Sequence, residues 1–78
     1  MALTELVKVI ACSLVDDPDQ VEVEEVEGDD ASVIELRVAP DDIGKVIGKD
    51  GRTAQSIRTL LMASSSKSGR RVLLDILD

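Results

Sequence analysis

The stretch "GKVIGKDGRT", residues 44–53, places three glycines and three basic residues within ten positions of a 78-residue chain. Ile43, Val46 and Ile47 have the spacing of the apolar face of a short helix. A second helical pattern begins soon after the last glycine of the stretch. Glycine tolerates the positive φ that a tight joint between two helices needs. The stretch therefore predicts two helices joined by a turn at residues 48–51.

The residues before this joint indicate one helix and two strands. An amphipathic helix is expected to end at the turn-forming "DDPD" of residues 16–19. Residues 21–27 and 32–39 alternate as strands, and the short turn "GDD" between them predicts an antiparallel hairpin. The alternation slips at Glu24–Glu25, which fits a β-bulge, and Asp41–Asp42 suit the first turn of the short helix. The apolar positions of the first helix are Leu3, Leu6, Val7, Ile10, Ala11 and Leu14.

The residues after the joint indicate a long helix and a closing strand. Ala54, Ile57, Leu60 and Leu61 are spaced for burial, up to the serine-rich residues 64–69, and residues 70–78 alternate as a strand. Since two helices connect the second strand to the third, these strands should run parallel. The sequence therefore predicts one α+β domain over residues 1–78. Its order is α-β-β-α-α-β, with three helices on one face of a three-stranded mixed sheet.

The net charge of −7 conceals an uneven distribution along the chain. Residues 1–42 hold thirteen acidic and two basic residues, whereas residues 43–71 hold one acidic and seven basic residues. Positive charge that is concentrated in one region indicates a localised anionic partner. The alternative is solvated charge scattered over helix faces.

Catalytic and metal-binding side chains are scarce. The chain has no histidine and one cysteine, which excludes histidine-based triads and zinc sites with several ligands. Cys12 lies among apolar residues and is expected to pack in the core. The glycine spacing fits neither the dinucleotide-binding nor the nucleotide-hydrolysing loop. We therefore expect no enzyme, metal or cofactor, and, without a signal peptide or an apolar span, a cytoplasmic location with no membrane partner.

The joint by itself fits two interpretations. In a purely structural joint, Gly48 caps the first helix and Asp50 caps the second. In a binding site, the unpaired amides at the start of the second helix hold an anion. Lys49, Arg52 and Lys45 would then add positive charge, and phosphate would be the natural ligand.

The joint and its flanks together resemble a KH domain of the type II arrangement. The motif V-I-G-x-x-G is met by Val46, Ile47, Gly48 and Gly51, and Ile57 occupies the apolar position expected on the next helix. The resemblance covers nearly the whole chain. By its size the chain is similar to the KhpA-type family, the small stand-alone KH-domain proteins of bacteria.

This resemblance implies binding of single-stranded RNA. The G-x-x-G loop of a KH domain clamps the backbone of about four nucleotides, and the bases lie in an apolar groove. The chain has no aromatic residue, which suits such a groove better than folds that stack bases on aromatic rings. For the apolar residues, burial in the core is the alternative. The implied RNA-binding residues are Gly48, Lys49, Asp50, Gly51, Arg52 and Lys45 around the loop, and Ile43, Val46 and Ile47 in the groove.

The resemblance also implies association with a second copy and with a larger KH-containing protein of the KhpB (Jag) family, in post-transcriptional control linked to cell elongation. Leu60 points to one side of the helix stripe, beside Thr53 and Ser64, so these three residues are a candidate dimer interface. Leu60 would otherwise widen the core. The alternative function is a protein–protein adaptor that keeps the KH fold with little RNA affinity, which the acidic first half favours.

Gly44 lies inside the short helix, where it costs about 0.8–1 kcal/mol relative to alanine. Its presence implies that either the long helix or a bound nucleotide approaches too closely for a Cβ atom. The helix contact predicts that Gly44→Ala lowers stability.

Overall fold

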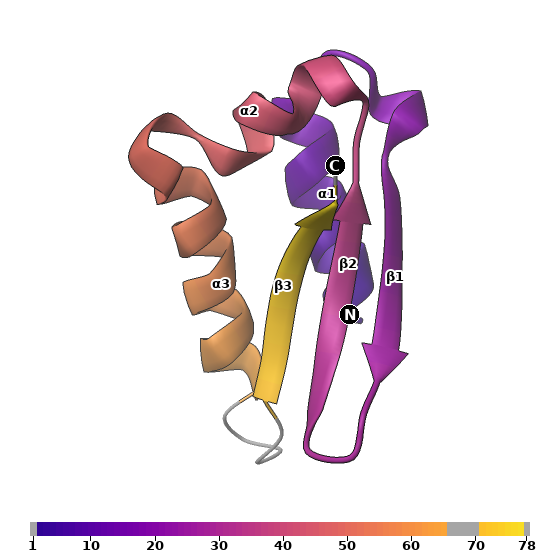
Figure 1. The fold of residues 1–78 in the computed structure, drawn as a ribbon, viewed down its shortest axis with the longest axis vertical. Coiled ribbons are helices and arrows are strands. Elements are labelled where there is room, and N and C mark those ends of the chain that lie inside the picture. The colour runs from indigo at the N-terminus through magenta and orange to yellow at the C-terminus, as the bar shows by residue number, and fades with distance from the viewer. Residues whose placement is uncertain (1, 66–70, 78) are drawn as a thin grey trace.

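The computed structural model describes residues 2–65 and 71–77, and it confirms the predicted order of elements. The strands lie in the order β1-β2-β3, with β1 antiparallel and β3 parallel to the central β2 (Figure 1). The predicted α+β fold with a mixed sheet is therefore correct. The elements are α1 (Leu3–Leu14), β1 (Glu22–Glu27), β2 (Ala31–Arg37), α2 (Ile43–Ile47), α3 (Arg52–Ser65) and β3 (Arg71–Leu77), with single 3-10 turns at Pro18–Gln20, Pro40–Asp42 and Lys49–Gly51.

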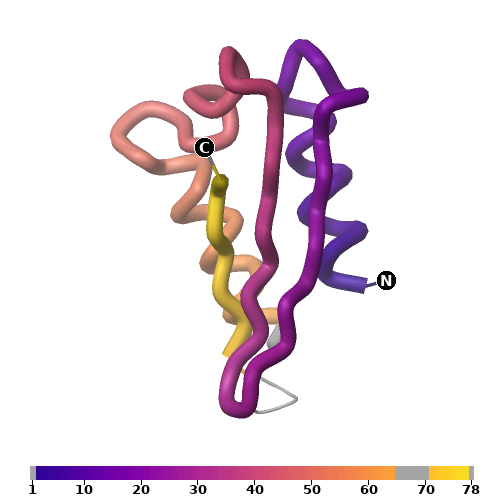
Figure 2. The backbone as a smooth tube through the Cα atoms, turned by 45° about the vertical axis from the view of Figure 1, so that its right-hand side comes forward, coloured from indigo at the N-terminus to yellow at the C-terminus, as the bar shows by residue number. Residues whose placement is uncertain are grey.

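The helices cover one face of the sheet and leave the other face uncovered (Figures 1 and 2). Side chains alternate across a strand, so every second residue points toward the helices. On β2 these are Ser32, Ile34 and Leu36, all of which are buried. The core between sheet and helices consists of Val7, Ala11, Val21, Ile34, Leu36, Val38, Val46, Ile57, Leu61, Val72 and Leu74.

Two predictions about the backbone were wrong in detail. β1 pairs with β2 without interruption from Glu22–Arg37 to Glu27–Ser32, so Glu24–Glu25 form no bulge. The alternation fails there because β1 is an edge strand whose second half is exposed on both faces. Asp41–Asp42 lie in the 3-10 turn before α2 rather than in its first turn. Of the serine-rich segment predicted to end the long helix, residues 66–69 lie outside the described residues.

Candidate nucleic-acid interface

Gly48 ends α2 as predicted. Its N–H donates to the carbonyl oxygen of Gly44 at 2.9 Å, and its φ of 79° and ψ of 173° fall in a region that only glycine occupies readily. A Cβ atom added here would overlap the Thr53 side chain and lie 2.9 Å from the Thr53 backbone nitrogen. The backbone of the joint therefore requires glycine at position 48 for reasons internal to the fold.

Gly51 differs from Gly48 in its surroundings. Its φ is 74°, but a Cβ atom added there would meet no heavy atom within 4 Å. Its N–H donates to the Gly48 carbonyl oxygen at 3.1 Å, which closes the turn. One side of the joint is therefore open to the approach of another molecule.

Asp50 does not cap the following helix, so this part of the purely structural interpretation is wrong. It adopts a left-handed φ of 57° inside the turn, and α3 begins two residues later, at Arg52. Aspartate is one of the few residues other than glycine that visit this conformation routinely. Its carboxylate is consequently presented at the tip of the joint.

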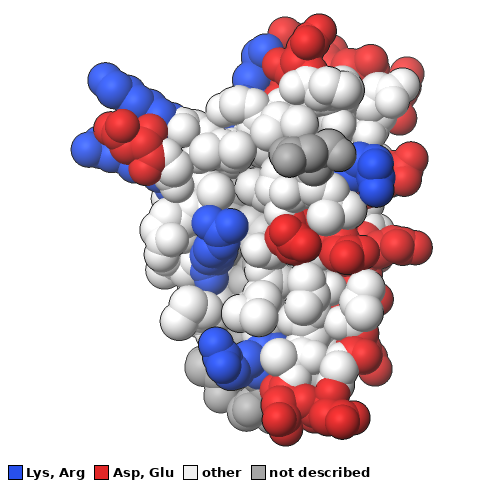
Figure 3. Space-filling view, in the orientation of Figure 1, with Lys and Arg blue, Asp and Glu red and all other residues white. Residues whose placement is uncertain are grey.

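The tip of the joint carries its charges in solvent. Lys49, Asp50 and Arg52 are all exposed, and Figure 3 shows basic side chains projecting at the corner where α2 meets α3, with an acidic group among them. The first-turn amides of α3 lack helical partners and give this end of the helix a partial positive charge. The structure thus gathers Gly48, Lys49, Gly51 and Arg52 at one exposed corner, together with the Asp50 carboxylate.

Lys45 belongs to a different set of interactions. Its Nζ lies 3.2 Å from Asp16 Oδ2 and 3.4 Å from Asp42 Oδ1. The hydrogen bond to Asp16, the charge of Asp16 and the bond to Asp42 raise the pKa of Lys45. The ammonium group is therefore held by two carboxylates on the side of α2 that faces the end of α1.

Asp42 is the residue that sequence reasoning missed. Its side chain is buried, and its Oδ2 accepts the backbone N–H of Asp17 at 3.1 Å. Burial raises the pKa of Asp42, but the backbone N–H groups of Asp16 and Asp17 and the Lys45 ammonium outweigh burial and hold the pKa below its ordinary value. The "DD" before the short helix was the available signal, although it does not show which aspartate turns inward.

The apolar residues of α2 divide between surface and core. Val46 has no exposed surface and belongs to the core, as the alternative interpretation held, whereas Ile43 is half-buried and Ile47 is 37% exposed. A Cβ atom on Gly44 would meet nothing within 4 Å, so the expected contact with the long helix is wrong. Gly44 and Ile47 are three residues apart and share a side of α2. Together with Ile43 they form a small exposed surface next to the joint.

The candidate dimer residues lie where the sequence placed them on α3. Leu60 is 49% exposed, Ser64 is exposed and Thr53 is half-buried against Gly48. Leu60 therefore does not widen the core. Cys12 is partly buried and packs against the core, as expected. Within the described residues, α1, α2 and α3 are each too short or too polar to span a membrane.

The fold and the joint define a KH domain with the type II order of elements. The chain belongs to the KhpA/KhpB KH-domain family, whose domain matches residues 4–76. A relative from Caldanaerobacter subterraneus, named RNA-binding protein KhpA, is 58% identical over 73 residues, which cover 94% of this chain and 97% of that protein. The protein of the same name from Aquifex aeolicus is 52% identical over 77 residues, covering 99% and 98%. The names of these relatives are those of RNA-binding proteins rather than enzymes.

A solved structure supports the fold assignment. The crystal structure of Era in complex with MgGDPNP and a segment of 16S ribosomal RNA aligns with a TM-score of 0.62 at 26% identity. The alignment covers 95% of this chain and 28% of the Era chain. The chain therefore corresponds to about a quarter of Era, and the similarity concerns that part alone.

Proposed function

We propose that this chain binds single-stranded RNA through the G-x-x-G joint. The observation that carries the proposal is the exposed turn at residues 48–51, where two glycines take positive φ and the side of Gly51 is open. Lys49 and Arg52 flank this opening, and the α3 amides lie behind it. A phosphate group meets both full and partial positive charge at this one point. The RNA-binding names of the relatives and the RNA segment in the Era complex point to the same ligand class.

The bases would lie on the exposed surface of α2. Ile43 and Ile47 offer aliphatic contact there, and the missing side chain at Gly44 lets a strand come close. Val46 supports this surface from within the core. Few phosphate contacts imply weak binding, with a shallow dependence of affinity on salt concentration.

Association of domains would raise this affinity. Two linked binding sites increase effective concentration without new contacts. We place the self-association surface on α3 at Leu60, Thr53 and Ser64, because Leu60 exposes half of a large apolar side chain. A homodimer, or a complex with a KH-containing protein of the KhpB (Jag) family, would act in post-transcriptional control linked to elongation of a bacterial cell, in the cytoplasm.

A protein–protein adaptor with little RNA affinity is the second candidate. The observation that favours it is the acidic surface along β1 and the hairpin, together with Asp50 at the tip of the joint (Figure 3). Such a surface repels phosphate. One measurement distinguishes the adaptor from the RNA-binding protein. In the adaptor, the affinity for RNA would not change with the charge at position 49.

The test is a titration of single-stranded RNA at low salt with Lys49→Asp and a matched variant, Lys8→Asp on α1. Lys49 and Lys8 are both exposed, so each change should alter stability by no more than about 0.5 kcal/mol. We expect Lys49→Asp to weaken binding at least tenfold, and Lys8→Asp to have a much smaller effect. Lys45→Gln should also weaken RNA binding less than Lys49→Asp does, because the Lys45 ammonium is already paired with two carboxylates. Equal affinity of a folded Lys49→Asp protein and the parent would reject the clamp and support the adaptor.

A further inference from the structure

The face of the sheet that the helices leave uncovered has an ordered arrangement of side chains. Because alternate residues share a face, the strand register places Glu24, Glu35 and Asp75 side by side across β1, β2 and β3. The next row toward the hairpin, two residues away along each strand, consists of Val26, Val33 and Leu73. An acidic row thus lies beside an apolar row, about 7 Å away.

The acidic row is unfavourable for the isolated fold. Like charges directly opposite each other on neighbouring strands destabilise a sheet. In the part of the chain that the structure describes, no Lys or Arg nitrogen lies within 4 Å of these three carboxylates. The same residues include no group of three or more potential ligands that could hold a metal ion. The row therefore contains negative charge with no partner inside the described fold.

Protection of sheet edges does not explain the row. Edge strands commonly carry charges that prevent pairing with other chains, which accounts for Glu24 on β1 and Asp75 on β3. Glu35, however, lies on the central strand β2, between two other carboxylates. Solvation of the uncovered face explains a polar residue at this position, but it does not explain three carboxylates directly opposite one another.

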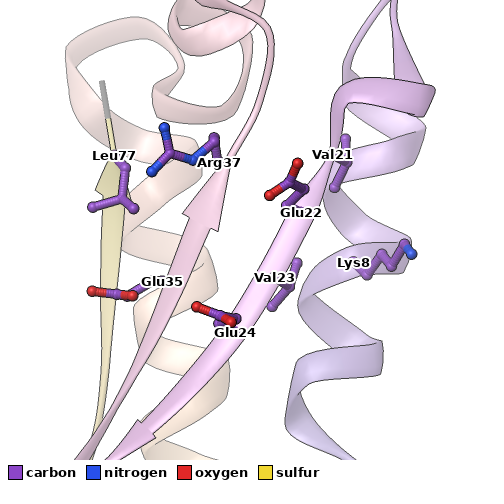
Figure 4. Close-up of a pocket in the computed structure, with 8 residues that line it drawn as sticks. All are labelled: Lys8, Val21, Glu22, Val23, Glu24, Glu35, Arg37 and Leu77. Atoms are coloured by element: carbon purple, nitrogen blue, oxygen red, sulfur yellow. The ribbon is translucent and has the colours of Figure 1, made fainter.

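The apolar row and a neighbouring hollow complete the surface. Val26 is 49% and Leu73 is 42% exposed, so two large aliphatic side chains of the row face solvent. A hollow of about 400 Å³ lies beside β1, and its lining includes three carboxylates, Glu22, Glu24 and Glu35, and two basic residues, Lys8 and Arg37. Figure 4 shows Lys8 on α1, across β1 from these carboxylates, and Arg37 on β2, in the row of Glu22 and Leu77. Neither makes an ion pair with a carboxylate of the described residues. A cationic side chain of another molecule would find both space and charge here.

We infer that this uncovered face, defined by the acidic row and the apolar row, is a docking surface for an amphipathic helix of a partner protein that carries Lys or Arg beside its apolar stripe. A helix packed on a sheet face is one of the standard layer arrangements of domains. Its aliphatic residues would cover Val26, Val33 and Leu73, and its cations would neutralise the acidic row. The negative charge excludes nucleic acid and anionic membranes from the same face. The surface is separate from the joint and from Leu60, and the inference does not depend on RNA binding.

The experiment titrates isotope-labelled protein with a helical peptide of Leu and Lys, and with its counterpart that has Glu at every Lys position. We expect the Lys peptide to shift the amide signals of the two rows, and the Glu peptide to leave them unchanged. Shifts centred on the joint or on α3, or equal binding of both peptides, would overturn the inference. Signals of the rows that shift with protein concentration alone would show instead that a second copy occupies the face.

Variants test the acidic row directly. The triple change Glu24→Gln, Glu35→Gln and Asp75→Asn should weaken binding of the Lys peptide at least tenfold while raising the melting temperature, because repulsion within the sheet disappears. The control, Glu5→Gln, Asp19→Asn and Asp30→Asn, removes the same charge from exposed sites elsewhere and should retain most of the affinity. Equal losses in both proteins would indicate unspecific attraction and contradict the inference. Leu73→Ser should weaken binding with all charges intact, and unchanged affinity of this variant would equally count against it.

Discussion

The Lys45 ammonium lies 3.4 Å from the buried carboxylate of Asp42, three residues earlier in the chain. The same carboxylate accepts the N–H of Asp17, which follows α1. This pair therefore links the end of α1 to the start of α2, the helix that leads into the glycine joint. Lys45, which directly precedes the KH motif, thus ties α2 to the end of α1, although its charge alone suggested a contact with phosphate.

Asp42→Asn should destabilise the protein at neutral pH and make its stability less dependent on pH in acid. The pKa of Asp42 is lowered by folding, so its contribution to stability is present above the ordinary carboxyl pKa and is lost as the pH falls through the folded value. The variant lacks this contribution at every pH. Urea unfolding at pH 7 and at pH 3 should show a difference from the parent that shrinks in acid.

Asp41→Asn is the control for this prediction, because Asp41 is the exposed neighbour of Asp42. Its stability should follow that of the parent at both pH values. If the difference in unfolding free energy between Asp42→Asn and the parent stayed constant down to pH 3, the charge of the carboxylate would not be the source of its contribution to stability.

The two glycines of the joint should respond differently to alanine. Gly48→Ala introduces an unfavourable φ and a clash with Thr53, which we expect to cost about 2–4 kcal/mol. Gly51→Ala meets no atom and should cost only the left-handed strain, about 1–2 kcal/mol. Chemical denaturation measures both values. Similar losses of stability in the two variants would contradict the packing of Thr53 against Gly48.

Gly44→Ala should stabilise the fold while weakening RNA binding. The position is exposed, helical and free of contacts, so alanine should gain up to about 1 kcal/mol, a rise of a few degrees in melting temperature. If an RNA strand passes close to this position, the added methyl group obstructs it. A stabilised variant with unchanged RNA affinity would show that the RNA does not pass close to Gly44.

Leu60→Asp should separate a dimer into folded monomers. Leu60 is 49% exposed on α3, so a charge there disturbs an interface rather than the core. Val9→Asp, at a 61% exposed position on α1, is the matched control and should leave the dimer intact. Light scattering gives the mass of each protein. A monomeric parent, or dissociation by both variants, would remove Leu60 from the interface.

The sequence was sufficient for most of the fold because the hydrophobic period differs between its elements. The four-residue spacing at Leu3, Val7 and Ala11 and the two-residue spacing at Ile34, Leu36 and Val38 each correspond to one kind of element with one buried face. The glycines at 48 and 51 likewise indicated positive φ before any coordinates, since few other residues tolerate it. These are local properties, set by neighbours in the chain.

Tertiary structure alone decided which polar and small residues face inward. Nothing local distinguishes Asp41 from Asp42, yet only Asp42 accepts the backbone N–H of Asp17, which lies beyond two strands in the sequence. Nor does local sequence show that Gly44 is uncrowded, because that depends on how far α3 lies from α2. The row of Glu24, Glu35 and Asp75 exists only once strand register brings three distant segments together. Local periodicity therefore determined the elements, whereas burial, ion pairing and surface charge depended on contacts between residues far apart in the chain.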